Sequence, residues 1–377
     1  MKKFLEFVKR LHEERFAVVI NRIVEEKIPV AVVSVQSPEV SLNAVKNFRE
    51  QGINVTTLIA VDPPSENSME NLAVVHLNDV SKLHPRPEYI FATNQTGARL
   101  ALKYLPECKI LLFASLITEN IYNTFMSHIP ELYEIYDSLI DEESKITFRG
   151  YWLGNILNQL GEIHHASSPH YLTAGFIPEP GAVVIDGGAF DGGTAAVLSG
   201  MGCKVYSFEM DKINYEFAKK IAEEKNFVIE NFGLGSHNHE MNYNHGGSAS
   251  NFDANGSETA KVITLDSYVR ENKLPRVDYI KLDVEGAELD VLRGATVTIG
   301  RWKPILAISA YHKWDDFWTL YNFVKSIRSD YEFAMRQYAT TPEDAPTEVT
   351  EEDMDMIYNI GLEPDSRWFN ECVLLAR

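Results

Sequence analysis

The stretch that most constrains the fold of this chain is residues 182–195, AVVIDGGAFDGGTA. It begins with three apolar residues, Val183 to Ile185, which are typical of a strand buried in a parallel sheet. The strand ends on Asp186, and a glycine-rich turn follows before a helical pattern opens at Thr194. A strand, a glycine turn and a helix in this order present a nucleotide-like ligand at the carboxyl end of an α/β sheet. The glycines allow close approach of the backbone to the ligand and positive φ.

The spacing within the turn separates two classes of nucleotide. A dinucleotide fingerprint needs Gly-x-Gly-x-x-Gly, whereas the turn here is Asp-x-Gly-x-x-x-Gly, formed by Asp186, Gly188 and Gly192. The next apolar run is followed by Glu209, whose carboxylate at a strand end accepts hydrogen bonds from ribose hydroxyls. The sequence therefore argues against a pyrophosphate and favours a ligand with a ribose and a cationic, amino-acid-like end.

Apolar runs alternate with helical patterns along the chain, which predicts an α/β fold with parallel sheets and two Rossmann-like domains. We expect a Rossmann-like domain over 1–118, a helical connector rich in aromatic residues over 119–165, and a second domain over 166–377. The second domain is predicted to end in an antiparallel hairpin, interrupted by an exposed acidic insert at 341–355. The first domain has no glycine turn after its first strand, so two roles stay open for it, a structural or docking domain and a nucleotide-sugar pocket.

The charge balance limits the partners. The 54 acidic and 35 basic residues give a net charge of -19, which argues against a nucleic-acid partner and against docking on anionic lipid. No apolar run approaches the length of a membrane span, and charged residues interrupt the start of the chain too early for a signal peptide. The three cysteines form no CxxC pair and are expected to be reduced. We expect a cytoplasmic protein without a membrane span, and a homo-oligomer stays open.

The glycine turn resembles motif I of class I S-adenosylmethionine (SAM)-dependent methyltransferases. Three later segments, YIKLDVEGAELDVLRGA at 279–295, ISAYHKWDDFW at 308–318 and ECVLLA at 371–376, resemble the FkbM family within that superfamily. The resemblance implies a mostly parallel sheet of seven strands with a terminal antiparallel hairpin, and SAM as cofactor. It also implies that Tyr171, shortly before motif I, lies near the cofactor, and that Asn231 and Phe232 border the adenine.

Two further strand ends supply candidates for the chemistry. Asp283 follows the fourth strand of the second domain and is predicted to face the methyl donor or the acceptor, although an acid-rich helix start is the alternative. His312 follows the fifth strand, where a histidine serves as general base or has a structural role. The predicted catalytic residues are His312 and Asp283, and the predicted cofactor contacts are Asp186, Gly188, Gly192, Thr194, Glu209, Asn231, Phe232, Asp283 and Tyr171.

No metal site is predicted. A loop holding His237, His239 and His245 matches no ligand spacing, and metal assistance is the lesser option for activating an acceptor. The sequence thus predicts SAM-dependent O-methylation of a hydroxyl on a sugar, glycan or secondary metabolite. Two alternatives stay open: a catalytically degenerate sugar-nucleotide-binding or assembly protein on the same scaffold, and an NAD(P)-dependent enzyme.

Overall fold

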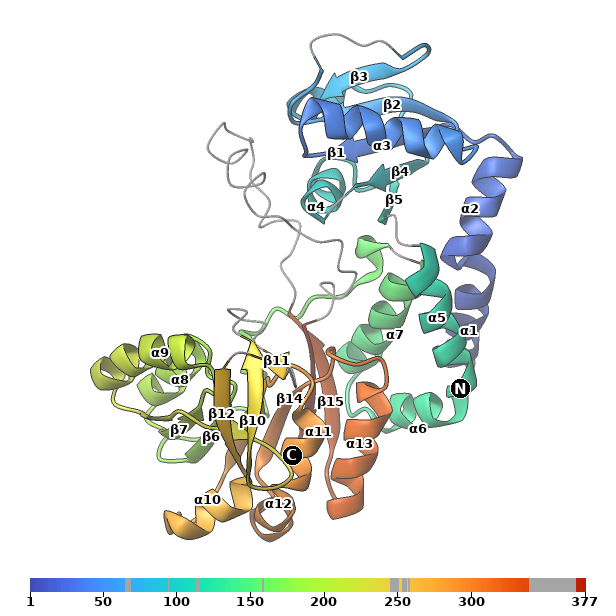
Figure 1. Cartoon of the computed structure of the whole chain (residues 1–377). Coiled ribbons are helices and arrows are strands. Elements are labelled where there is room, and N and C mark those ends of the chain that lie inside the picture. The colour runs from blue at the N-terminus through green and yellow to red at the C-terminus, as the bar shows by residue number, and fades with distance from the viewer. Residues whose placement is uncertain are drawn as a thin grey trace. The chain divides into compact units, whose positions relative to one another are not determined.

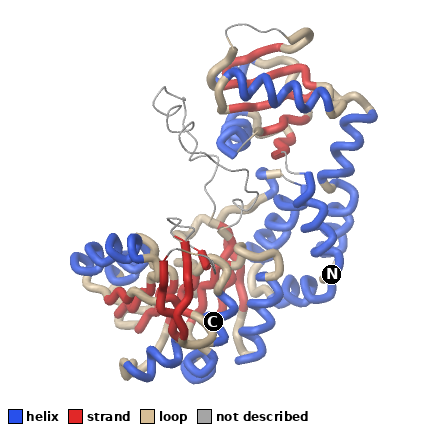
Figure 2. The backbone as a smooth tube through the Cα atoms, viewed as in Figure 1, coloured by secondary structure: helices blue, strands red, loops and turns tan. Residues whose placement is uncertain are grey.

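The structure is a computed structural model, and it describes residues 1–64, 69–93, 95–112, 115–157, 159–244, 251–252, 256, 258–338 and 371–377. The chain divides into two compact units, drawn in Figures 1 and 2. The N-terminal unit contains the described residues of 1–133 and 146–165. The C-terminal unit contains residues 134–145, 166–338 and 371–377.

The N-terminal unit is built on a five-stranded sheet in which every pair of neighbours is parallel. Its central strand is fully buried, and successive side chains contribute to different cores, Val30 and Val32 to one and Ala31 and Val33 to the other. This is the alternation expected of a strand covered on both faces. The strands, in sheet order, are β3 (Ala73–His76), β2 (Val55–Ala60), β1 (Val30–Ser34), β4 (Tyr89–Ala92) and β5 (Lys109–Leu112); α3 (Pro38–Glu50), η1 (Leu77–Lys82) and α4 (Gln95–Tyr104) connect them.

Aromatic side chains hold the helical part of this unit together. The Phe125 and Trp152 rings pack edge to face with centroids 5.0 Å apart, and Phe7 contacts Phe125 at 5.6 Å. These residues lie on α5 (Ser115–Ser127), α7 (Glu142–Leu157) and α1 (Lys2–Glu14); α2 (Phe16–Glu25) follows α1, and η2 (Leu160–Glu162) follows α7. Aromatic residues of the segment 119–165 complete a core with the first helix. The helices α6 (Ile129–Ser138) and α7 each have residues in both units.

The C-terminal unit contains a seven-stranded sheet in which β16 runs antiparallel to both of its neighbours. Strand β6 lies between β13 and β7, so connections leave it in both directions and create a switch point at its carboxyl end. In sheet order the strands are β15 (Phe333–Gln337), β16 (Cys372–Ala376), β14 (Ile305–Ser309), β13 (Tyr279–Leu282), β6 (Val183–Gly187), β7 (Lys204–Phe208) and β8 (Val228–Glu230).

The helices of this unit are α8 (Gly193–Gly200), α9 (Lys212–Lys225), α10 (Leu265–Glu271), α11 (Glu288–Arg293), α12 (Thr296–Trp302) and α13 (Asp316–Ile327). A smaller sheet has the order β11 (Asn251–Phe252), β10 (His239–Asn244), β12 (Glu258–Ile263), β9 (Gly233–Leu234). Its strand β10 includes His239, which stacks on His237 at 4.2 Å; His245 and the acidic insert lie outside the described residues.

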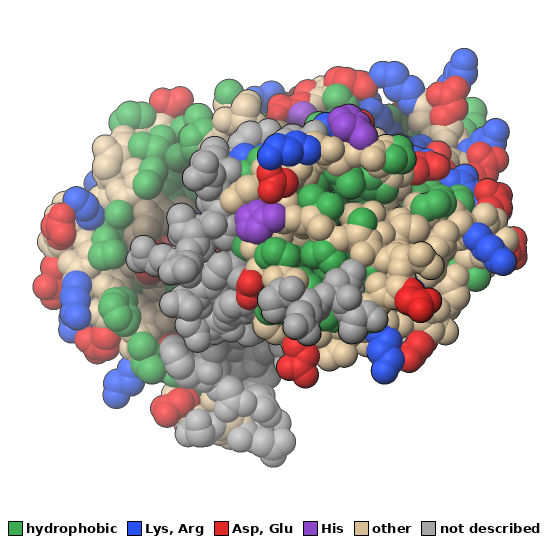
Figure 3. Space-filling model, turned by 90° about the horizontal axis from the view of Figure 1, so that it is seen from above, with side chains coloured by type: hydrophobic (Ala, Val, Ile, Leu, Met, Phe, Trp, Pro, Cys, Tyr) green, Lys and Arg blue, Asp and Glu red, His purple; other side chains and the backbone are tan. Residues whose placement is uncertain are grey.

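Two further features are the apolar character of the helices and the distribution of charge on the surface. In the described parts of the chain, no helix combines the length and the apolar character that a membrane span requires. On the face of the molecule in Figure 3, the Lys and Arg side chains are interspersed with Asp and Glu side chains.

Candidate functional site

A cavity of about 280 Å³ lies at the carboxyl ends of β6, β7 and β13, at the switch point of the seven-stranded sheet. Apolar and acidic side chains share its wall, which suits a ligand with an aromatic ring at one end and hydrogen-bond donors elsewhere. Among the predicted site residues, Gly188, Glu209, Phe232 and Asp283 line it. The other lining residues include Phe190, Met210, Leu234, Glu285, Tyr311 and Glu371.

The glycine turn is shaped by contact with the neighbouring strand. Gly188 has a φ of 77°, and a Cβ added to it would lie 1.8 Å from the carbonyl oxygen of Asp283. Gly192 also has positive φ, 84°, but it begins α8 and its closest neighbours belong to Phe227 and Ala218. Gly188 therefore brings the turn against the cavity, whereas Gly192 allows α8 to pack against its neighbours.

Asp186 lies behind the cavity wall. It is fully buried, its Oδ1 lies 3.1 Å from the ammonium of Lys281, and its Oδ2 accepts a hydrogen bond from Ser207. Parallel pairing of β6 with β13 places Lys281 in register with Asp186. The lysine also donates to the carbonyl oxygen of Gly188 at 2.5 Å. Asp186, a predicted cofactor contact, is therefore not among the residues that line the cavity. Its carboxylate pairs with Lys281, and the same lysine holds the glycine turn through the carbonyl oxygen of Gly188.

Glu209 is held in place by two backbone donors. Its Oε2 accepts from the amide of Phe190 and its Oε1 from the amide of Asp211, both at 2.8 Å. Burial raises the pKa of Glu209 to about 7, and these two amides and Lys281 oppose that shift. Each carboxylate oxygen retains acceptor capacity, so the group is able to receive the hydroxyls of a ribose.

Three predicted cofactor residues, Asn231, Tyr171 and Thr194, do not line the cavity. The amide of Asn231 donates to the carbonyl oxygens of Glu209 and Met210 at 2.9 and 3.1 Å, which fixes the segment after β7. Tyr171 is buried and donates to Asp283 Oδ2 at 2.9 Å. Thr194 lies on α8 and is half-buried.

Asp283 is surrounded by donors. In addition to Tyr171, Tyr311 donates to Oδ1 at 3.2 Å. Burial raises the pKa of Asp283, but the charges of Lys281 and His312 and the hydrogen bond from Tyr171 outweigh it, so the pKa is lowered overall. Asp283 therefore stays ionised at neutral pH and presents a negative charge to the cavity.

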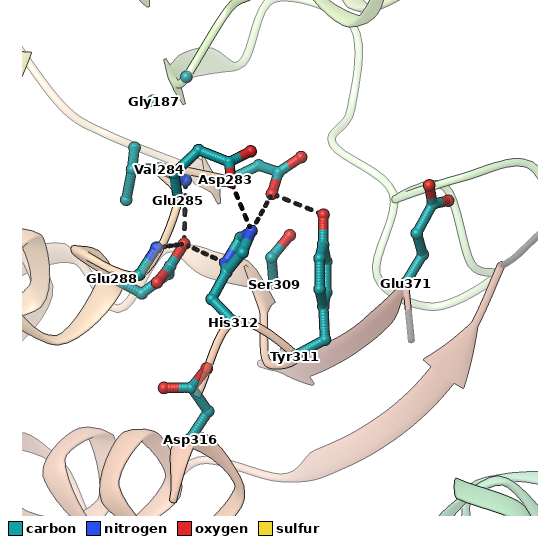
Figure 4. Close-up of polar contacts among 12 residues, drawn as sticks. Gly187, Asp283, Val284, Glu285, Glu288, Ser309, Tyr311, His312, Asp316 and Glu371 are labelled. Carbon is teal, nitrogen blue, oxygen red and sulfur yellow. Dashed lines mark hydrogen bonds and ion pairs between the residues drawn. The ribbon is translucent and has the colours of Figure 1, made fainter. Parts of the chain in front are cut away.

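His312 lies among three carboxylates, as Figure 4 shows. Its Nε2 is 3.7 Å from Asp283 Oδ1 and 3.5 Å from Glu285 Oε2, and its Nδ1 is 2.9 Å from Glu288 Oε1. Burial lowers the pKa of His312, but the hydrogen bond and the charge of Glu288, with the other two carboxylates, raise it to about 9. The three carboxylates therefore favour the protonated imidazole, and a role for His312 as general base remains a prediction.

Sequence reasoning missed several residues of this site. Glu288 is one of them: it lies at the acidic start of α11, yet it is buried, accepts a hydrogen bond from the amide of Val284 at 2.9 Å and contacts His312. Lys281 was not singled out, although a lysine within the apolar strand Tyr279–Leu282 is a signal that it needs a buried acid opposite.

Comparison with known proteins identifies part of the chain. Residues 186–338 match the family model described as the methyltransferase FkbM domain. The match covers less than half of the chain and identifies what this segment is similar to. The segment contains the glycine turn and every cavity-lining residue named above except Glu371. A sequence comparison with curated proteins finds no match.

Solved structures similar to this chain include three methyltransferases or methylases. The crystal structure of methyltransferase FkbM from Methylobacillus flagellatus KT has a TM-score of 0.63 and 18% identity, covering 99% of this chain and 98% of that chain. An rRNA methylase from Streptococcus thermophilus gives a TM-score of 0.31 at 14% identity, with 53% of this chain and 87% of that chain covered. A SAM-dependent methyltransferase from Geobacter sulfurreducens, in complex with S-adenosylhomocysteine, gives 0.30 at 13%, with 56% and 92% covered. The first of these shows an α/β fold shared over almost the whole chain.

Proposed function

We propose that the protein is a SAM-dependent methyltransferase and that SAM binds in the cavity at the carboxyl ends of β6, β7 and β13. The observation that carries the proposal is the buried carboxylate of Glu209 on the cavity wall, one strand away from the glycine turn. In the proposed complex the ribose hydroxyls donate to Glu209, and the adenine packs among the apolar side chains of Met210, Phe232 and Leu234.

The acceptor is proposed to be a hydroxyl of a sugar, glycan or secondary metabolite. Asp283, Glu285, Tyr311 and Glu371 all line the cavity. Carboxylates accept hydrogen bonds from hydroxyls, so this wall suits a polyhydroxylated acceptor. In the proposed transfer, the acceptor oxygen would form a bond to the methyl carbon while the carbon–sulfur bond of SAM breaks and the sulfonium becomes a thioether. The proton of the hydroxyl would pass to water. The protein contributes mainly alignment of the two reactants, because the sulfonium already activates the methyl group.

Calorimetric titration with S-adenosylhomocysteine, run beside NADH, tests the cofactor. We expect micromolar binding of S-adenosylhomocysteine alone, and a loss of affinity in Glu209→Gln. Glu216→Gln changes an exposed glutamate on α9 and is the matched control. Binding of NADH alone would favour the oxidoreductase alternative, and binding of neither would favour the degenerate scaffold.

A further inference from the structure

The Asp283–Glu285–His312 cluster has the arrangement of a cation site at the edge of the cavity. Asp283 and Glu285 follow β13, and His312 follows β14, so two neighbouring parallel strands bring the three groups together. One ligand atom from each residue lies within 4.8 Å of the other two. Figure 4 shows both carboxylates on the Nε2 side of the imidazole.

The second observation is the buried imidazole nitrogen. The His312 side chain is 10% exposed, and its Nε2 makes no hydrogen bond to the residues that the structure describes. At 3.5 and 3.7 Å from the two carboxylates, a proton on Nε2 is too far from either for a hydrogen bond. Two carboxylates therefore converge on a nitrogen that neither of them engages closely.

A divalent cation fits this geometry better than a proton. With ligand bonds of about 2.1 Å, neighbouring ligand atoms around a tetrahedral or octahedral cation lie about 3.0–3.4 Å apart. The observed contacts of 3.5 and 3.7 Å would close onto a cation with shifts of a few tenths of an ångström. One nitrogen and two carboxylate oxygens are a donor set that suits Mn²⁺ and other first-row divalent cations.

The groups behind the cluster orient it in the manner of an outer ligand shell. Glu288 is 1% exposed and faces His312 Nδ1, which directs Nε2 toward the two carboxylates. Tyr171 and Tyr311 donate to Asp283, which holds its carboxylate in position. Glu285 has a φ of 51°, an unfavourable conformation for a side chain of this kind, and such conformations cluster where function requires them.

We propose that Asp283, Glu285 and His312 bind one divalent cation, which uses its remaining coordination positions to hold the acceptor hydroxyl in the cavity. The role in catalysis rests on the proposed function, whereas binding of the cation does not. A cation held by these residues would make the proton of a bound hydroxyl easier to lose to water, which would favour attack of the acceptor oxygen on the methyl group of SAM. In this site His312 would bind the cation through Nε2 as a neutral imidazole, with Nδ1 facing Glu288.

Titration of the full chain with MnCl₂, followed by calorimetry and by the electron paramagnetic resonance signal of free Mn²⁺, tests the proposal. We expect one Mn²⁺ per chain, and a loss of affinity of at least about tenfold in both Glu285→Gln and His312→Gln. Asp290→Asn, on the same helix as Glu288 and paired with Arg293 at the surface, is the matched control and should bind like the wild type. Glu285 is one-third exposed, so its substitution should leave the fold intact, which a thermal melt verifies.

Two results would overturn the cation site: no Mn²⁺ binding by the wild-type chain, or equal binding by the wild type and both cluster variants. Titration of the same samples with S-adenosylhomocysteine separates the two proposals. If the chain binds S-adenosylhomocysteine but not Mn²⁺, the cation site is refuted and the proposed cofactor stands. If it binds Mn²⁺ but not S-adenosylhomocysteine, the cation site stands and the proposed cofactor is refuted.

Discussion

Glu209 makes the proposed cofactor site dependent on pH. Its pKa is raised from 4.5 to about 7, with burial as the largest cause. The carboxylate must be ionised to accept both ribose hydroxyls, and at this pKa it is about one-tenth ionised at pH 6 and about nine-tenths ionised at pH 8. The affinity for a ribose ligand should therefore rise about tenfold between pH 6 and pH 8.

The Glu209→Gln variant isolates this contribution. The amide keeps the volume of the side chain but does not ionise, so its affinity for the ligand should not follow the same pH dependence. At pH 8 we expect binding weaker than in the wild type by about 1.5–3 kcal/mol, the range for a hydrogen bond to a charged group. The assay is calorimetric titration with S-adenosylhomocysteine and with adenosine. Adenosine has the same ribose but lacks the amino and carboxyl groups of the homocysteine part, which titrate themselves.

In the unliganded protein, the raised pKa of Glu209 makes stability fall with pH, whereas it makes affinity for the ligand rise. A carboxyl whose pKa is raised in the folded state binds a proton there more tightly than in the unfolded state, so stability falls as pH rises from 4.5 to about 7. This shift lowers the free energy of unfolding by about 3 kcal/mol over that pH range. The decrease should be absent from the pH profile of urea unfolding of Glu209→Gln. Equal affinity for S-adenosylhomocysteine in variant and wild type at pH 8, with the same pH dependence, would refute the assignment of Glu209.

Three further substitutions test the framework of the protein by urea unfolding. Lys281→Met should lower the free energy of unfolding by about 3–5 kcal/mol because it leaves Asp186 as an unpaired buried charge. Adding Asp186→Asn should restore much of this loss, and a double variant no more stable than Lys281→Met would contradict the pairing. Gly188→Ala should destabilise by roughly 2–5 kcal/mol, since its Cβ would collide with the Asp283 carbonyl, and a neutral effect would mean that the turn lies elsewhere. Trp152→Ala should cost about 3–5 kcal/mol by emptying a fully buried site, whereas a loss below about 1 kcal/mol would argue against that aromatic core.

Local sequence patterns were sufficient for the elements around the site. The run that ends in Asp186 predicted a buried strand followed by a glycine turn, and β6 with the positive φ of Gly188 matches it. The predicted α/β fold with parallel sheets is confirmed. It was predictable because strand burial and helix periodicity are properties of short segments. The placement of Glu209 after β7 followed from the same reasoning.

Contacts between strands were beyond the sequence patterns. The pairing of Lys281 with Asp186 depends on the register of β13 against β6, which no local spacing specifies. The gathering of Glu285, Glu288 and His312 depends on a left-handed residue after β13 and on the neighbouring position of β14. The contact of Phe7 with Phe125, which joins the first helix to the segment 119–165, likewise depends on tertiary packing that no local spacing specifies.

The most direct test of the central claim is a crystal structure of the protein with S-adenosylhomocysteine. We expect density for the ligand at the carboxyl ends of β6, β7 and β13, with the ribose hydroxyls on Glu209 and the adenine beside Phe232. Its sulfur should point toward Asp283 and the cluster around His312. Ligand density away from this cavity, or a ribose that does not contact Glu209, would contradict the proposed SAM site.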